Sequence, residues 1–155
     1  MTTYTYQTID FTGSTNTMAL SINSNGQIVG AYSSDGGQTS NGFLDNNGVY
    51  TTIDPPGSTG AGATDINSLG QIVGTYQPAG GGTALGFFYS HGTYTTIDPL
   101  SSNSQYINGY LYLNKTGQIV GTVRDTTTGV DHGFLYSHGT TQLSRCFFYP
   151  GPRHR

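Results

Sequence analysis

Apolar residues along this chain fall into short runs, separated by clusters of Gly, Asn, Asp and Ser. Some runs, such as QIVGAY at residues 27–32, are almost continuously apolar, which is typical of strands buried on both faces. Others, such as VYTTID at residues 49–54, alternate between polar and apolar positions, as strands nearer solvent do. The pattern therefore predicts an all-β chain of short strands.

Tight turns separate the predicted strands. The stretch NSNG at residues 23–26 suits a type I turn with its Gly in the left-handed region, and a second turn is expected at residues 35–37. The third is the two-residue turn Asn47-Gly48, which becomes His-Gly in two later copies; both central residues of such a type I′ turn need a positive φ. Four strands joined by three such turns form an antiparallel meander.

The same meander recurs along the chain. Its markers lie 44 residues apart in the first interval, and three extra residues in the second interval fall within residues 100–111. The repeat region, residues 1–143, therefore divides into three full repeats and a preceding strand, YTYQTID, that ends an incomplete copy. That strand covers residues 4–10, the repeats cover about residues 11–54, 55–98 and 99–143, and residues 144–155 form a tail that does not match the repeat.

The segment GQIVG, which begins at Gly26, Gly70 and Gly117, marks the second strand of each repeat. Its first Gly is expected to take the left-handed turn position. Its Ile and Val are expected to fill the two faces between neighbouring units, and its last Gly to allow a close backbone approach.

A four-stranded unit of about this length is typical of a β-propeller blade. A parallel β-helix is disfavoured because tight hairpin turns make neighbouring strands antiparallel, and a β-sandwich does not require a strict period. Propellers typically close with four to eight blades, so three do not close alone. We predict an all-β propeller with three blades per chain, closed as a six-blade dimer. Residues 4–10 then complete a blade across the seam, in their own chain or in the partner.

Composition restricts the partners. Only 8% of residues are charged and the formal net charge is −3, so no nucleic-acid partner is expected. The single cysteine, Cys146, excludes an intrachain disulfide framework and a cysteine-rich zinc site. No apolar run approaches the roughly 18 residues of a membrane span, and the first residues lack the basic and apolar regions of a signal peptide.

Tyrosine is the most suggestive side chain for binding. The flat apolar faces and polar tips of the twelve tyrosines suit sugar stacking or a protein interface, while packing between blades is the plainer interpretation. The absence of Trp weakens the case for a carbohydrate site. The candidates are two equivalent pairs, Tyr32 with Tyr76 and Tyr50 with Tyr94.

Two further sets of repeated side chains are candidate ligand-binding groups. Asp54 and Asp98, with Asp10, recur at one position and would form a ring of carboxylates at one rim, or else bond local backbone N–H groups at strand ends. His91 and His138 replace an Asn in the type I′ turn, where tolerance of positive φ explains them without a ligand.

Motifs that identify a reaction are absent from the sequence. The stretch DINSLGQI at residues 65–72 is similar to the start of a calcium loop, but its twelfth position is Tyr76 rather than an acid, which favours a simple turn. A Ser-His-Asp order, a phosphate-binding Gly-rich loop before a helix, HExxH and CxxC are all missing. We predict no catalytic residue, no metal site and no cofactor.

The stretch INSLGQIVGTYQPAGGGTALGFFYSHGTYTTID, and the copy that contains His132-Gly133-Phe134, resemble the HAF-type probable extracellular repeat family of bacteria. In that family an Asn-x-x-Gly-Gln-(Val/Ile)-Val-Gly segment precedes His-Ala-Phe. The resemblance covers roughly residues 9–140, although Asn41 and Leu85 replace the His in the first two copies. It implies a propeller-like protein that is extracellular or on the cell surface, without a catalytic signature. Because this chain shows no signal peptide, a cytoplasmic location is the alternative.

The function that we expect is a non-enzymatic binding or scaffold module that assembles with itself, as a dimer, into a closed ring. A carbohydrate or protein ligand would bind between blades or at the rim. One alternative is a glycan-binding, lectin-like propeller. The other is a hydrolase that uses the central channel, where Ser21, Asp65 and Tyr112 differ at one equivalent position and would break the symmetry.

Overall fold

The computed structural model describes residues 3–101 and 105–144 and contains three antiparallel sheets of about four strands each. In two sheets the strands follow chain order, and in the third the first strand is split into two pieces that both pair with the next strand, so the structure confirms the predicted all-β meanders. Sheet 1 contains β1 (Asn16–Ile22), β2 (Ile28–Ser33), β3 (Asn41–Asn46) and β4 (Val49–Thr52). Sheet 2 contains β5 (Ser58–Ile66), β6 (Ile72–Pro78), β7 (Leu85–Ser90) and β8 (Thr93–Ile97). Sheet 3 contains β9 (Gln105–Ile107), β10 (Tyr112–Leu113), β11 (Ile119–Asp125), β12 (Val130–Ser137) and β13 (Thr140–Leu143).

The predicted turns have the backbone angles that they need. Asn47, His91 and His138 have φ of 54°, 49° and 51°, and the Gly after each also has a positive φ, as a type I′ turn requires. The first Gly of each GQIVG segment has a φ between 73° and 80°. Turn chemistry readable in four residues therefore sets the strand boundaries.

The first strand of sheet 3 is interrupted, unlike β1 and β5. Both β9 and β10 pair with β11, and residues 108–111 between them leave the ladder. The three extra residues predicted within residues 100–111 account for this break. Leu111 is fully buried where the chain returns to the sheet, and its side chain lies against Gly121.

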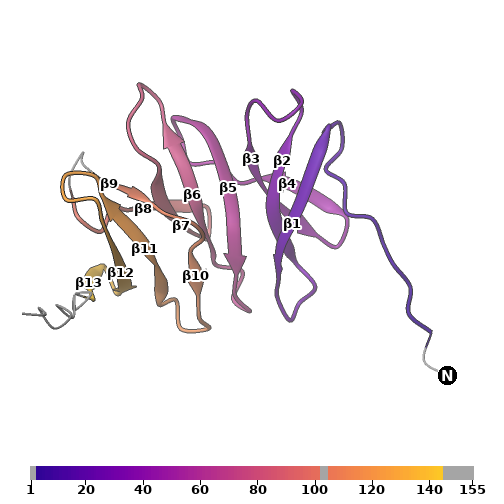
Figure 1. The fold of residues 1–155 in the computed structure, drawn as a ribbon. Coiled ribbons are helices and arrows are strands. Elements are labelled where there is room, and N and C mark those ends of the chain that lie inside the picture. The colour runs from indigo at the N-terminus through magenta and orange to yellow at the C-terminus, as the bar shows by residue number, and fades with distance from the viewer. Residues whose placement is uncertain (1–2, 102–104, 145–155) are drawn as a thin grey trace, which may run out of the picture.

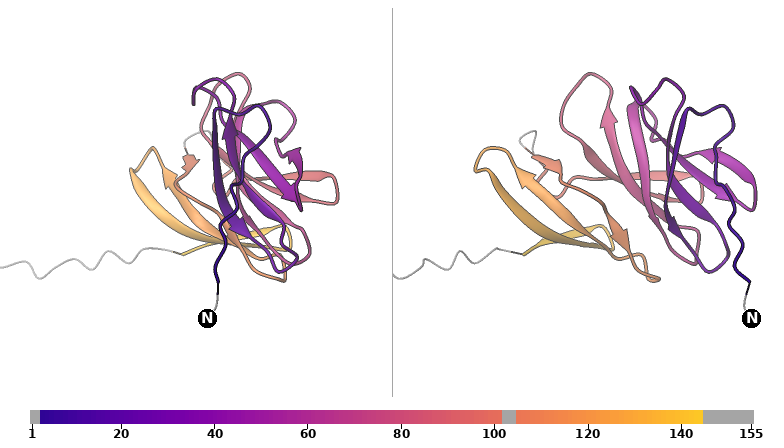
Figure 2. Two further views of the ribbon diagram at one scale, coloured as in Figure 1. Left: turned by 90° about the vertical axis from the view of Figure 1, so that its right-hand side faces the viewer. Right: turned by 45° about the vertical axis from the view of Figure 1, so that its right-hand side comes forward.

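The three sheets lie side by side in a row, with sheet 2 in the middle (Figures 1 and 2). The first strands of the sheets, β1, β5 and β10, run along one side of the row and contact each other across the junctions. One apolar cluster fills each junction. Val29, Ile53, Ala63, Ile66, Ile72 and Phe87 form the cluster between sheets 1 and 2, and Val73, Ile97, Ile107, Leu111, Ile119, Val123 and Phe134 form that between sheets 2 and 3.

The two clusters confirm the roles expected for GQIVG. Val29 and Val73 face the following sheet, whereas Ile72 and Ile119 face the preceding one, and all four are fully buried. The last Gly of the segment lies where a Cβ would overlap neighbouring atoms, so the core uses the missing side chain of glycine.

Residues 3–10 form no strand and lead away from sheet 1 (Figure 1). The expected strand at residues 4–10 is thus not paired within the described part of its own chain. Phe11 anchors the segment, because its ring stacks on Tyr32 with centroids 3.7 Å apart. The described residues also include no helix long and apolar enough to cross a membrane.

Candidate functional site

The turns before β2, β6 and β11 join each sheet to the next. In the middle turn, the Asn67 side-chain oxygen accepts hydrogen bonds from the backbone N–H groups of Leu69 and Gln71 at 3.0 and 3.1 Å. Its amide nitrogen donates to the carbonyl of Asn114 in sheet 3 at 3.0 Å, and Asn23 in sheet 1 donates in the same way to the carbonyl of Asn67 at 2.9 Å. The three asparagines therefore form a ladder in which each sheet donates to the one that follows.

A carboxylate reinforces this ladder. Asp65 accepts hydrogen bonds from the Ser21 hydroxyl of sheet 1 at 2.6 Å and from the Leu113 backbone N–H of sheet 3 at 2.9 Å. It thus links all three sheets. The sequence singled out the position of Ser21, Asp65 and Tyr112 as a source of asymmetry for a hydrolase, and the structure gives Asp65 a structural partner on each side instead.

We expect Asn67→Ala to lower the free energy of unfolding by about 2–3 kcal/mol. Asn67 is buried, and removing its side chain leaves several backbone groups without their hydrogen-bond partner. Asn114→Ala is the matched control. Asn114 makes the same bonds within its turn but is exposed and donates to no further sheet in the described chain. Its cost should be about 1 kcal/mol when both variants are measured at protein concentrations low enough for the chains to be single, so that no second chain lies against sheet 3. Urea unfolding followed by circular dichroism measures both, and equal costs would show that the bond between sheets is unimportant.

The four candidate tyrosines lie at equivalent positions of sheets 1 and 2 and do not line a shared pocket. The hydroxyl groups of Tyr32 and Tyr76 bond Thr52 and Thr96 in the outer strands at 2.9 and 3.1 Å. The Tyr94 ring packs on Phe87, with centroids 5.8 Å apart, and Tyr76 and Tyr94 both pack against the cluster between sheets 1 and 2. Tyr76 and Tyr94 are therefore used in packing between sheets, which is the plainer interpretation of the sequence, whereas the rings of Tyr32 and Tyr50 pack on Phe11 next to sheet 1.

The Tyr50 and Tyr94 side chains share one environment. Burial raises the pKa of both phenols above the usual value, with further contributions from Asp45 at Tyr50 and from Tyr89 at Tyr94. Each phenol also has a hydrogen bond with the backbone of the Ile-Asp segment that precedes its sheet, Asp10 for Tyr50 and Asp54 for Tyr94; this bond acts in the opposite direction on the pKa. Residue 10 thus occupies the same place on sheet 1 that residue 54 occupies on sheet 2.

The two candidate aspartates lie at strand ends. Asp54 accepts a hydrogen bond from the Gly42 backbone N–H at 2.8 Å, and burial raises the pKa of its carboxyl. One carboxylate oxygen of Asp98 is buried without a hydrogen-bond partner among the described residues, as is the amide nitrogen of Gln105. Asp54 therefore binds a backbone N–H group, as one interpretation of the sequence predicts, whereas one carboxylate oxygen of Asp98 does not.

The candidate histidines are exposed at the tips of two hairpins. In each case Nδ1 lies 2.9 Å from the hydroxyl of the preceding serine, Ser90 for His91 and Ser137 for His138. This pairing was not foreseen from the sequence. No group of three or more His, Cys, Asp or Glu side chains that could hold a metal occurs in residues 3–101 and 105–144.

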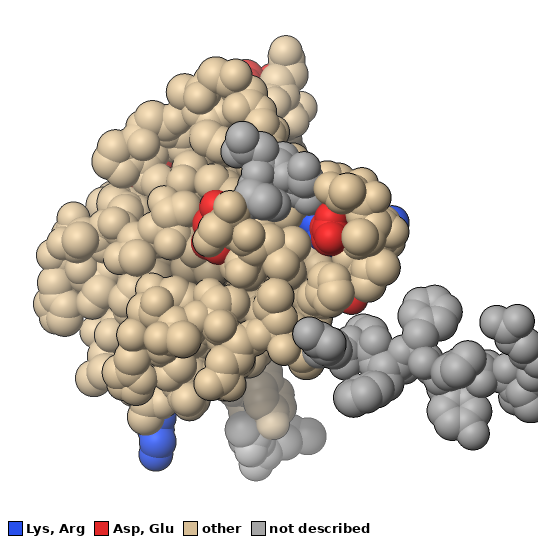
Figure 3. Space-filling model, turned by 90° about the vertical axis from the view of Figure 1, so that its left-hand side faces the viewer, with Lys and Arg blue, Asp and Glu red and all other residues tan. Residues whose placement is uncertain are grey.

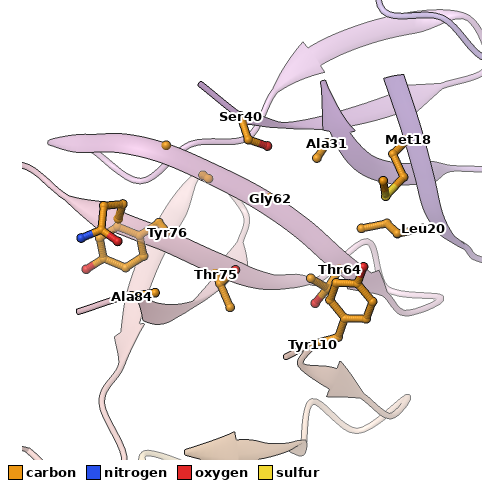
Figure 4. Close-up of a pocket in the computed structure, with 13 residues that line it drawn as sticks. Met18, Leu20, Ala31, Ser40, Gly62, Thr64, Thr75, Tyr76, Ala84 and Tyr110 are labelled. Atoms are coloured by element: carbon orange, nitrogen blue, oxygen red, sulfur yellow. The ribbon is translucent and has the colours of Figure 1, made fainter. Parts of the chain in front are cut away.

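A shallow hollow of about 440 Å³ lies between sheets 1 and 2 (Figure 4). Met18 and Leu20 of β1 and Tyr110 of the β9–β10 connection surround it, and small residues of β5 form its floor. Thr64 in this floor already donates to the Leu111 carbonyl at 2.7 Å. The lining contains no charged side chain, and of the eight candidate residues only Tyr76 reaches it, so the hollow offers apolar contact rather than acid–base chemistry.

The two ends of the row are the surfaces that the repeat leaves open. We call the open side of sheet 1, with Ala19, Ile22 and Ile28, the first end face, and the open side of sheet 3, with Val120 and Leu135, the second end face. Ile22 is 64% exposed, whereas the equivalent Ile66 in sheet 2 is 5% exposed. Val120 is 48% exposed, whereas the equivalent valines of sheets 1 and 2 are fully buried. The same apolar positions are therefore buried at internal junctions and exposed at the ends.

Charge is sparse around the second end of the row. The view from that side shows only scattered acidic and basic side chains among uncharged ones (Figure 3). The ion pair between Arg124 and Asp131, 3.1 Å apart, lies near the turn that joins β11 and β12. Exposed apolar positions with few charges are typical of a surface that binds another protein surface.

No protein-family model matches the chain, and neither a curated protein nor a solved structure matches it. The resemblance to the HAF-type repeat family therefore stays a prediction that rests on the repeat residues themselves.

Proposed function

We propose that this chain is a non-enzymatic scaffold or binding module that self-associates through its two end faces into a closed, six-sheet β-propeller. One observation carries the proposal. Val29 and Val73 are fully buried at the two internal junctions and Ile66 is buried at the first, whereas the equivalent Val120 and Ile22 at the ends of the row are exposed. Burying such apolar side chains is the main favourable contribution to protein association.

The polar groups of the two end faces complement each other. The Asn114 side-chain amide on sheet 3 stands at the position of the donors Asn23 and Asn67, but in the described chain it donates only to Gln118 in its own turn. The Asn23 carbonyl on sheet 1 stands at the position of the acceptors Asn67 and Asn114. The described chain gives that carbonyl only the Gly26 backbone N–H as a donor, at 3.1 Å. A junction between sheet 3 of one chain and sheet 1 of another would continue the asparagine ladder with the same type of hydrogen bond, from a side-chain amide to a backbone carbonyl.

Such a junction joins two different faces, so it generates a ring if the rotation closes and a filament if it does not. Propellers close with about four to eight blades, and six is the one multiple of three in that range. Two chains are therefore the expected assembly. A closed ring of repeats also agrees with the resemblance to the HAF-type family, whose implied extracellular location stays a prediction.

Light scattering coupled to size-exclusion chromatography tests the proposal. The wild-type chain is expected at about twice its mass of 16.4 kDa. Val120→Asp should shift it to a single chain, because an unpaired charge buried at an interface costs about 3–5 kcal/mol, which weakens the dimer at least about 100-fold.

Val49→Asp is the matched control. Val49 is even more exposed than Val120, 66% against 48%, but lies on the outer strand β4, away from both end faces. It should leave the dimer intact. A wild-type chain that stays monomeric at every concentration would overturn the proposal, as would a Val120→Asp variant that associates as tightly as the control.

A further inference from the structure

We propose that residues 4–10 of one chain form the fourth strand of sheet 3 in a second chain and displace β13 there. This inference rests on the self-association proposed above and specifies its seam. Four observations carry it: the path of the N-terminal segment, its exposure, the poor fit of β13, and the pairing that an exchanged strand would restore.

The N-terminal segment leaves sheet 1 along the path of a connection between sheets. The buried Pro55 and Pro99 follow the Ile-Asp pairs that end sheets 1 and 2, and Phe11 stands at the equivalent position. Phe11 packs on Tyr32 and also on Tyr50, with ring centroids 5.6 Å apart in the second case. Tyr50 contacts the backbone of Asp10 as Tyr94 contacts that of Asp54. Residues 4–10 therefore emerge where the fourth strand of a preceding sheet would end.

The segment itself has the composition of an outer strand but lacks a partner. Tyr6 is 99% exposed, whereas the equivalent Tyr50 and Tyr94 are partly buried in outer strands. An extended run of Tyr and Thr with unpaired backbone groups is a template for strand pairing. Sheet 3 of the same chain lies at the opposite end of the row (Figures 1 and 2), so the edge that fits must come from a second chain.

The fourth strand of sheet 3, β13, packs poorly against the rest of the sheet. Its Leu143 is 42% exposed, and Ser144 stands where Ile53 and Ile97 fill the junctions of the other sheets. A hollow of about 380 Å³ remains there, bordered by Val120, Gly133 and Ser144. An isoleucine at this position would close the hollow and cover Val120.

Residues 4–10 supply what β13 lacks. In the register of sheet 2, where Gly86 pairs with Ile97 and Tyr89 with Tyr94, Ile9 would pair with Gly133 and Tyr6 with Tyr136. The Tyr89 and Tyr94 rings lie 4.8 Å apart. Tyr136 instead faces Thr141 of β13. The exchanged strand would therefore restore both the buried isoleucine and the aromatic pair.

Cysteine cross-linking tests the exchange. In a Cys146→Ser background, Tyr6→Cys and Tyr136→Cys are combined in the full chain and oxidised mildly. Paired residues of antiparallel strands have Cα atoms about 4.5–5.5 Å apart, which a disulfide can bridge. Non-reducing electrophoresis should show a covalent dimer. The matched control pairs Tyr6→Cys with Tyr89→Cys, because β7 already pairs with its own fourth strand. The dimer yield should exceed that of the control at least about tenfold, because assembly raises the effective thiol concentration.

A second pair, Tyr136→Cys with Thr141→Cys, reports whether β13 keeps its place. It should form little disulfide within one chain when the protein is dimeric. Efficient closure of this disulfide in the dimer, or a Tyr6–Tyr136 yield no higher than the control, would overturn the exchange. A light-scattering mass measured on the same samples separates the two proposals. A monomer contradicts self-association itself, whereas a dimer without the cross-link contradicts only the exchanged strand.

Discussion

Replacing Gly74 with alanine is expected to lower the free energy of unfolding by at least about 3 kcal/mol. A Cβ at this position would overlap the carbonyl oxygen of Gly62 in the neighbouring strand and would lie 2.7 Å from two carbon atoms of the Phe87 ring. The ring is fully buried in the cluster between sheets 1 and 2 and the other obstacle is backbone, so neither moves without disturbing the middle sheet.

Gly62→Ala is the control for the Gly74 substitution. Gly62 lies in β5, adjacent to the residue that pairs with Gly74, but a Cβ there would meet only the Ala31 methyl group at 3.7 Å, an ordinary contact. Its φ is not positive, so alanine adds no strain. We expect a change within about 0.5 kcal/mol. Thermal and urea unfolding of both variants measure the difference, and a Gly74→Ala protein as stable as the control would refute the close approach.

Replacing Phe87 with alanine is expected to cost about 3–5 kcal/mol, the range for a large aromatic side chain removed from a core. Phe87 is fully buried at the junction between sheets 1 and 2 and packs its edge against the Tyr94 ring. Because native domains are stable by only about 5–15 kcal/mol, this loss would leave much of the protein unfolded at moderate temperature.

Two further substitutions show what the Phe87 change measures. Phe87→Leu keeps most of the volume and should cost about 1–1.5 kcal/mol, since it loses mainly the aromatic contact. Leu69→Ala removes a side chain that is largely exposed in a turn and should change stability by less than about 0.5 kcal/mol. If Phe87→Ala cost no more than Leu69→Ala, the junction would not be a core.

Features that depend on a few adjacent residues were predictable from the sequence. The type I′ turns at Asn47, His91 and His138 follow from the tolerance of Asn, His and Gly for positive φ. The meanders follow from the spacing of such turns, and the break between β9 and β10 from three extra residues.

Contacts between repeats were not predictable in the same way. The sequence marked Asp65 as part of a calcium-like loop, but its partners, Ser21 and Leu113, lie 44 and 48 residues away. The Tyr32 side chain was a candidate for binding a ligand, yet one face of its ring is stacked on Phe11. Such pairings depend on how one sheet is placed against the next, and no local pattern contains that information.

The amino-acid pattern alone thus determines three repeated antiparallel sheets, because strand alternation and turn angles are local properties of the chain. The tertiary structure decides which copies of a repeated residue are buried. Val73 and Val120 occupy the same position in identical GQIVG segments, and only the presence of a following sheet buries the first and leaves the second exposed. Burial depends on neighbours in space, and those neighbours differ between the middle and the ends of the row.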